Sequence, residues 1–180
     1  MEIREPTVAD ASQIARVHVD SWRTTYAGIV SQAYLDSLSY EKRSSEWREI
    51  ISDPMKVWKG WFCLVADESD SGVVGFARAG PERSGKYGIS GELGAIYLLK
   101  AHHRKGIGRQ LMAKVALRLR EDGHGSLLAW VLAANPFKAF YEALGGRQIA
   151  ERPVTIGGVD LPEIAYAWDS VTVLEGPTES

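Results

Sequence analysis

The sequence predicts a single domain of the α/β (α+β) class, with a central mixed sheet flanked by helices. Three observations support this prediction. The 180 residues are 45% hydrophobic and 24% charged, a composition typical of a globular chain with one core. Residues 61–99 alternate β-forming runs with turn residues, which predicts an antiparallel meander. Residues 89–144 alternate strand-like and helix-like segments, which predicts a parallel strand pair joined by a crossover helix.

The N-terminal third is expected to be mostly helical. Residues 1–4 can form a short strand, and the spacing of Thr7 and Asp10 matches a capping box that starts a helix. Residues 31–51 mix apolar and charged side chains, which favours one or two further helices that close at Pro54. The apolar residues of the first helix recur at helical spacing and share one face: Ala11, Ile14, Ala15, His18 and Trp22.

The meander is expected to contain three strands. Residues 61–66 and 73–79 are rich in β-formers and flank turn chemistry at 67–72, so they predict a hairpin. A polar, glycine-bearing loop at 81–88 leads to the third strand at 89–99. These strands form the antiparallel part of the sheet.

The C-terminal half predicts a helix over residues 107–119, a buried strand over 127–132 and a helix that starts at Asn135 and Pro136. Residues 1–170 are predicted to form the domain, with a C-terminal tail over residues 171–180. Three short segments are expected to supply the closing strands: 147–150, 154–156 and 161–168.

Charge and cysteine content exclude several classes of protein. Lys plus Arg number 21 and Asp plus Glu 23, so a formal net charge of -2 provides no global attraction to nucleic acid or an anionic membrane. Cys63 is the single cysteine and excludes an internal disulfide or a multi-thiolate zinc site; we expect it to be an inert core residue. His102 and His103 are neighbours that should point apart, and we predict no metal site. With no apolar signal segment at the start, the sequence favours a soluble, cytoplasmic protein.

A basic glycine loop over residues 100–109 is the densest functional signal. It lies between a predicted strand and the first turn of a helix, where unpaired N–H groups and a partial positive charge attract anions. Arg104, Lys105 and Arg109 add positive charge, while Gly106 and Gly108 allow the backbone to approach a ligand. A pyrophosphate is the expected ligand; the alternative is a solvated basic turn. A dinucleotide fingerprint would need glycine where Leu111 stands, and the Gly-Lys-Ser/Thr of a P-loop is absent.

Two ordered motifs carry a family resemblance. The strand Glu92-Leu93-Gly94-Ala95-Ile96-Tyr97-Leu98-Leu99 followed by Gly106-Ile107-Gly108 resembles motif A of the GNAT superfamily of coenzyme-A-dependent N-acetyltransferases. His103 departs from the Gln or Arg that the family pattern carries at its first position. The segment from Asn135 to Gly146 resembles the family's motif B. The resemblance implies a GNAT-like fold in which two parallel strands splay apart.

The resemblance also implies a site for acetyl-CoA as acyl donor. Ile96, Tyr97 and Leu98 would offer backbone groups to the pantetheine arm, and Asn135 would touch the same arm unless it acts only as a helix cap. Tyr141 would lie near the sulfur. The pyrophosphate would be held by backbone N–H groups from a set of six residues: Arg104, Lys105, Gly106, Ile107, Gly108 and Arg109.

The activity that the resemblance implies is direct acetyl transfer from the thioester to an amine of a small molecule or peptide. Glu92 matches the position of a general base that often works through water, and the Tyr141 hydroxyl matches a proton donor to the departing sulfur. The N–H of Leu98 would polarise the carbonyl. The alternatives are a solvent-facing strand carboxylate for Glu92 and an ordinary core ring for Tyr141.

The acceptor is expected to be bound by the N-terminal region and the 81–88 loop. Aromatic residues there either wall an acceptor pocket or pack between helices: Trp22, Tyr26, Tyr34 and Trp47. His18 is expected to be a satisfied core histidine.

A non-catalytic sensor of acyl-CoA is the alternative function, and a nucleic-acid-binding regulator has little support in the net charge. A homodimer is compatible with the resemblance.

Overall fold

The computed structural model describes residues 1–53 and 59–175, and over these residues seven strands form one mixed sheet. Their order is β1-β2-β3-β4-β5-β7-β6, and every neighbouring pair is antiparallel except β4 with β5. The predicted class and the single parallel pair are therefore confirmed. The strands are β1 Glu2–Arg4, β2 Phe62–Glu68, β3 Gly72–Pro81, β4 Gly91–Leu98, β5 Leu127–Leu132, β6 Arg147–Ile156 and β7 Val159–Trp168.

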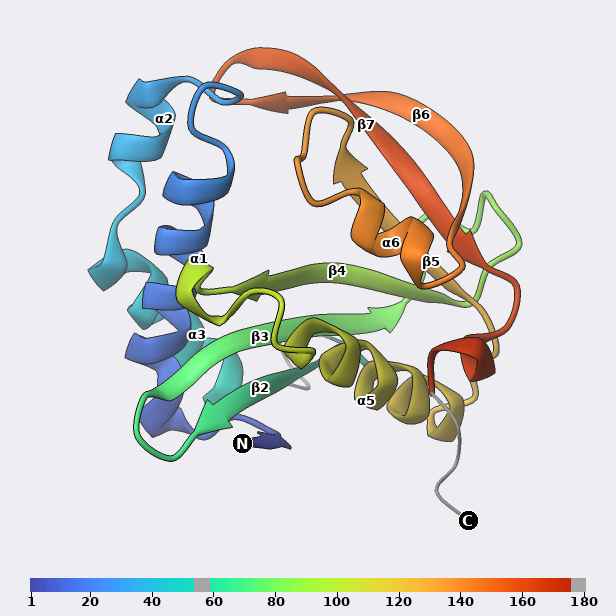
Figure 1. Cartoon of the computed structure of the whole chain (residues 1–180), viewed down its shortest axis with the longest axis horizontal. Helices are drawn as coiled ribbons and strands as arrows, with labels where there is room; N and C mark the ends of the chain where they lie inside the picture. The colour runs from blue at the N-terminus through green and yellow to red at the C-terminus, as the bar shows by residue number, and fades with distance from the viewer. Residues whose placement is uncertain (54–58, 176–180) are drawn as a thin grey trace.

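Helices cover both faces of the sheet (Figure 1). The helices α5 and α6 pack on one face, and α1 and α3 lie on the other side of the sheet toward β2, β3 and β4. The helix α2 lies beside α1, where it packs toward the ends of β5, β6 and β7. The α-helices are α1 Ala11–Thr25, α2 Gln32–Ser37, α3 Tyr40–Ser52, α5 Ile107–Glu121 and α6 Ala139–Ala143. The short 3-10 helices are η1 Val8–Asp10, η2 Lys100–His102 and η3 Val171–Leu174.

Alternation along the strands divides the core between the two faces. In β2, Phe62 and Leu64 pack in the cluster that includes α5, whereas Cys63 and Val65 pack in the cluster that includes α1. Cys63 is a free, buried thiol, and burial raises its pKa, so the expectation of a core cysteine is confirmed. A strand with apolar side chains on both faces is the pattern expected where helices cover both sides.

The start of α1 is held by an ion-pair network. The Thr7 backbone N–H donates to Asp10 Oδ2 at 2.7 Å, and the Thr7 hydroxyl donates to the same oxygen at 2.9 Å. Arg4 donates to both oxygens of Asp10 and also to Asp67 of β2, which ties β1, η1 and the sheet together. The Arg4 hydrogen bonds, opposed by burial and aided by Thr7, lower the Asp10 pKa to about 2.

The closing strands differ from the prediction. Residues 147–150 and 154–156 belong to one strand, β6, whose pairing with β7 runs from Arg147 to Ile156. Pro153 had broken the sequence pattern, but β6 is an edge strand, where a proline removes no ladder hydrogen bond that the sheet needs. The predicted three segments are corrected to two strands.

The C-terminal residues are also more ordered than expected. Residues 171–174, assigned to the tail, form η3, in which Val171 and Leu174 are buried in the α5 core. The Val171 N–H donates to the Gly125 carbonyl at 2.9 Å. Pro54 and the tail residues 176–180 lie outside the described residues. Within residues 1–53 and 59–175, no helix combines the length and the apolar character needed to cross a membrane.

Candidate active site

The strands β4 and β5 stay paired over three residues only. Gly91–Leu93 lie beside Leu127–Ala129, and no further β4 residue pairs with β5. The β3–β4 register shifts between the Leu93 and Ala95 pairs, which leaves Gly94 as the extra residue of a β-bulge. Because a bulge bends its strand, the second half of β4 turns away from β5 and presents an open edge.

The backbone groups on this edge follow from the ladder on the other side. The Leu99 N–H donates to the Val74 carbonyl at 2.9 Å, which makes that position a hydrogen-bonded pair of the antiparallel ladder. Since such pairs alternate, the backbone groups of Tyr97 point toward β3, and those of Ile96 and Leu98 point toward the open edge. Contact of these three residues with pantetheine stays a prediction, and the register favours Ile96 and Leu98 over Tyr97 for it.

The loop before α5 has the backbone shape of an anion cradle. Arg104 has φ 60° and Gly106, the N-cap of α5, has φ 81°, so two left-handed residues bend the chain just before the helix. The first turn of α5 begins at Ile107 and directs its unpaired N–H groups out of the helix end. Gly108 faces α6 closely, because a Cβ there would lie 3.2 Å from the Phe140 ring.

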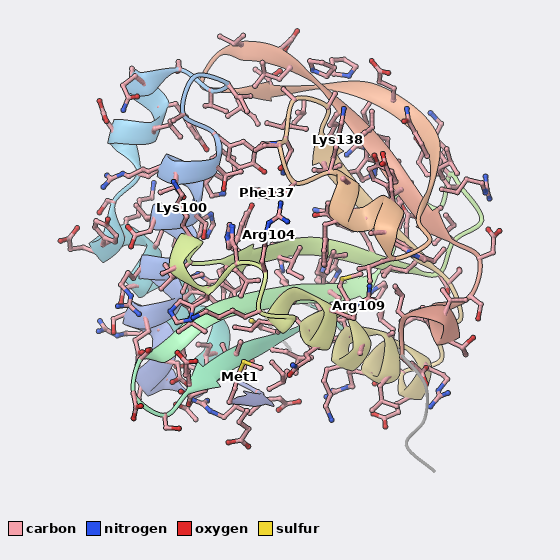
Figure 2. All side chains as sticks on the ribbon, in the orientation of Figure 1. Met1, Lys100, Arg104, Arg109, Phe137 and Lys138 are labelled. Carbon is pink, nitrogen blue, oxygen red and sulfur yellow. The ribbon has the colours of Figure 1, made fainter. Side chains whose placement is uncertain are left out.

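Positive side chains surround this loop. In the part of the chain that the structure describes, Arg104, Lys105 and Arg109 make no ion pair with a carboxylate. Figure 2 shows Arg104 and Phe137 projecting between the loop and the segment that precedes α6, with Arg109 at the front of α5. The positive charge of Arg104, Lys105 and Arg109 is thus available to an anionic ligand beside the amide cradle.

His103 has a structural role that the sequence did not indicate. Its Nε2 lies 3.0 Å from the Leu98 carbonyl, which also accepts a 3.0 Å hydrogen bond from the Ser21 hydroxyl of α1. The His103 ring packs edge-on against Phe137, with 4.8 Å between ring centroids. His103, which stands where the family pattern has Gln or Arg, therefore ties the loop to the end of β4. His102 points elsewhere, as expected, with Nδ1 3.4 Å from Glu68.

Three tyrosine hydroxyls are close enough to interact electrostatically: Tyr26 at the C-cap of α1, Tyr97 of β4 and Tyr141 of α6. Burial is the main cause that raises the pKa of each, and each also receives a smaller contribution from the hydroxyl of another member. All three hydroxyls therefore stay protonated at neutral pH. The Tyr141 ring stacks on Tyr166 with centroids 5.5 Å apart, so Tyr141 is both a core ring and a neighbour of the site.

Asn135 links the two sides of this group. Its Oδ1 accepts from the Phe137 N–H at 2.8 Å, and its Nδ2 donates to the Tyr26 hydroxyl at 3.2 Å. The regular part of α6 begins at Ala139, so Asn135 caps the turn before α6 and not the helix start that its Pro136 had suggested. Both side-chain ends of Asn135 are occupied in this arrangement.

Glu92 is buried, with 2% of its surface exposed, so the alternative of a solvent-facing carboxylate is wrong. Its oxygens accept three hydrogen bonds from Arg83: from the backbone N–H at 3.2 Å, from Nε at 3.0 Å and from Nη2. Arg83 lies in the 81–88 loop that was expected to help choose the acceptor. Sequence reasoning missed this pair because neither periodicity nor a motif connects the two positions.

The aromatic N-terminal residues separate into two groups. Trp22, Tyr26 and Tyr34 contact one another near the site, with centroid distances of 4.9 and 5.8 Å from Trp22. Trp47 instead packs against Phe76 in the core under α1 and α3. Trp47 therefore takes no part in a pocket wall, and the packing alternative holds for it.

His18 differs from the expected satisfied core histidine. The imidazole stacks on Tyr97, with centroids 5.2 Å apart, and its buried Nδ1 has no hydrogen-bond partner among the described residues. Burial, with a smaller contribution from Arg43, lowers the His18 pKa to about 4. The ring is therefore neutral at physiological pH.

Comparison with known proteins gives consistent matches. The model of the FR47-like protein family matches residues 81–154. The chain is 41% identical over 173 residues to "uncharacterized N-acetyltransferase YuaI" of Bacillus subtilis (strain 168), covering 96% of this chain and 95% of the relative. It is 27% identical over 124 residues to spermidine N(1)-acetyltransferase of Thermoplasma acidophilum, covering 68% and 73% of the two chains.

A solved structure shares the fold. The PaiA N-acetyltransferase from Thermoplasma acidophilum, in complex with coenzyme A, superposes with a TM-score of 0.67 at 23% identity. The alignment covers 91% of this chain and 96% of that one. The two chains therefore share the overall fold.

Proposed function

The chain belongs to the GNAT superfamily of N-acetyltransferases, and from this premise we propose that it transfers the acetyl group of acetyl-CoA directly to an amine. The proposed acceptor is an amine of a small molecule or peptide. The observation that carries the proposal is the open edge of β4 leading to the amide cradle of α5. The β4 edge would offer backbone amides to a pantetheine arm. The loop before α5 would offer N–H groups and positively charged side chains to a pyrophosphate.

The residues fit the pyrophosphate and the pantetheine arm of coenzyme A. The N–H groups of the α5 first turn and the side chains of Arg104 and Arg109 would hold the pyrophosphate. The backbone groups of Ile96 would bind a pantetheine amide as a strand partner does, and the N–H of Leu98 would face the thioester end of the arm. Bound there, acetyl-CoA would supply the activated acyl group as a thioester.

Two side chains are proposed to handle protons. The Tyr141 hydroxyl is protonated at every assay pH because burial raises its pKa, so it is suited to donate a hydrogen bond to the sulfur that leaves. Glu92 lies at the middle of the three paired positions, one residue before the last pair, and it would accept the amine proton there through a water molecule. The Leu98 N–H would stabilise negative charge that develops on the carbonyl oxygen.

Because Arg83 occupies both oxygens of Glu92, the base role requires its own test. If Glu92 accepts the proton, Glu92→Gln lowers kcat by about 100-fold or more and leaves coenzyme A affinity unchanged. In the matched variant Arg83→Gln the carboxylate remains, so a larger share of the activity survives than in Glu92→Gln. Equal losses in both variants at every pH would show that the pair is only structural.

The cofactor and the reaction are tested separately. Calorimetry with coenzyme A and acetyl-CoA tests the binding edge, and absence of heat at millimolar ligand would overturn the proposal. Release of free thiol from acetyl-CoA, measured with a panel of amines, tests the transfer. Binding without thiol release from any amine would favour the alternative of a sensor. The spermidine named for one relative makes polyamines a necessary member of the panel.

A further inference from the structure

A tryptophan, an arginine and a buried glutamate form a cluster on β5, β6 and β7; we call Trp130, Arg152 and Glu163 the Arg152 cluster. The Arg152 Cζ lies 3.8 Å from the centroid of the Trp130 ring. Its Nε donates to Glu163 Oε1 at 2.5 Å. Stacking and a charged hydrogen bond together fix the guanidinium plane, so its remaining N–H groups are directed before any ligand arrives.

The Arg152 cluster lies at the mouth of the diverging strands. Trp130 directly follows Ala129, the last β5 residue that pairs with β4. Ala129 belongs to the core that contains α5, whereas Trp130 packs with Leu128 on the other face. Alternation therefore puts Trp130 on the face opposite α5, at the first β5 position beyond the paired segment.

The cluster is also within electrostatic reach of the proposed base. The hydrogen bond to Glu92 is the main cause that raises the Arg83 pKa, and the charges of Glu82 and Glu163 add smaller contributions. Glu82 uses its oxygens within its own loop, where it accepts from the N–H groups of Ser84 and Gly85. Glu92 is paired with Leu128, which packs with Trp130, and Tyr87 of the Arg83 loop contacts the Trp130 ring with centroids 5.9 Å apart. The two Arg–Glu pairs, Arg83–Glu92 and Arg152–Glu163, therefore border the same part of the face.

Each pair presents its cation outward. The side chains of Glu92 and Glu163 are 3% and 11% exposed, whereas those of Arg83 and Arg152 are 62% and 47% exposed. A molecule that approaches this face meets guanidinium groups before carboxylates. Among the described residues, neither terminal nitrogen of Arg152 makes a hydrogen bond, so a planar edge of donors is left open. Such an edge matches a carboxylate in bidentate geometry.

We propose that the acceptor is a small amine that also carries a carboxylate, with Arg152 binding the carboxylate while the amine reaches the mouth between β4 and β5. This inference rests on the proposed acetyl transfer and narrows its substrate class. A polyamine is disfavoured on this surface, because its ammonium groups would meet two outward guanidiniums and carboxylates that are already paired.

Matched acceptor pairs test the proposal: amino acids against their carboxamides, with spermidine and a short peptide as further amines. Replacing the acceptor's carboxylate by a carboxamide should lower kcat/KM by about 10- to 100-fold, the range expected for a hydrogen bond to a charged group. Arg152→Gln should raise KM for the amino acid by a similar factor and leave kcat unchanged. The kcat/KM values for an amino acid and its carboxamide should then become nearly equal.

Two controls separate binding from folding. Arg152→Gln leaves Glu163 buried without its partner, so the double variant Arg152→Gln with Glu163→Gln removes both charges and should show the same loss of discrimination. Arg147→Gln changes another β6 arginine, one that pairs with exposed Asp169, and should preserve the preference.

Equal rates with amino acids and carboxamides, or a preference for spermidine, would overturn the carboxylate site and leave acetyl transfer intact. Discrimination that persists in both Arg152 variants would also overturn it. Absence of transfer to every amine, despite coenzyme A binding, would instead count against the proposed function.

Discussion

Replacing Tyr141 by phenylalanine removes one oxygen atom from the site and keeps the surrounding core. The ring stacks on Tyr166 at 5.5 Å with an interplanar angle of 9°, and phenylalanine preserves that packing. We therefore expect the free energy of unfolding to change by less than about 0.5 kcal/mol. The effect should fall on the chemical step alone.

The size of that effect follows from the burial of the hydroxyl. Tyr141 is protonated at assay pH, since burial raises its pKa, and a hydrogen bond from it to a thiolate is a bond to a charged acceptor. Such bonds contribute about 1.5–3 kcal/mol, which corresponds to about a 10- to 100-fold loss of kcat. The KM for acetyl-CoA should stay within about twofold, because the ground-state thioester carries no charge on sulfur.

Tyr166→Phe is the matched control, since it alters the other ring of the same stack. The Tyr166 hydroxyl donates to Glu142 at 2.7 Å, so its loss should cost about 1 kcal/mol of stability and leave kcat unchanged. Steady-state thiol release and urea unfolding on both variants give the comparison. A Tyr141→Phe enzyme with wild-type kcat, or equal kcat losses in the two variants, would refute the assignment of Tyr141 as proton donor.

Three further outcomes are expected. Gly106→Ala, at φ 81°, should destabilise the fold by about 1 kcal/mol and weaken coenzyme A binding in calorimetry; unchanged affinity would contradict the cradle. Asp10, with a pKa lowered from 3.8 to about 2, should stabilise the fold by about 2 kcal/mol above pH 4 and lose that contribution as the pH falls to 2. Asp10→Asn should remove this pH dependence of urea unfolding. Coenzyme A should slow hydrogen exchange at the Ile96 and Leu98 amides much more than at the Tyr97 amide. Equal slowing at all three amides would contradict the proposal that Ile96 and Leu98 face the cofactor.

The architecture could be predicted because its signals are local. Strand β5 and the start of α5 follow directly from an apolar run and from Gly106, and the parallel pair follows from the order of elements. The prediction was wrong at Pro153, where local propensity forbids a central strand and only the full topology shows that β6 is an edge. It was wrong at residues 171–174 as well, because their burial depends on a distant helix.

The sequence indicated the backbone geometry of the candidate site, and it gave no sign of the side-chain pairs beside that backbone. The amide cradle depends on residues that are adjacent in sequence, so a short motif indicates it. The Arg83–Glu92 and Arg152–Glu163 pairs join positions 9 and 11 residues apart across strands and a loop, and no periodicity relates them. The Tyr26–Asn135 hydrogen bond spans 109 residues and is visible only in three dimensions.

The open strand edge explains why these unpredicted contacts cluster where they do. An unpaired edge leaves backbone donors and acceptors without partners, which costs free energy where water is excluded. Here one of those groups, the Leu98 carbonyl, is satisfied by Ser21 and His103, and Tyr26 is held across the opening by Asn135. These bonds come from α1, the loop before α5 and the turn before α6, so elements far apart in the sequence supply polar partners around the opening. The divergence itself follows from the bulge at Gly94, and the side-chain bonds satisfy polar groups beside it.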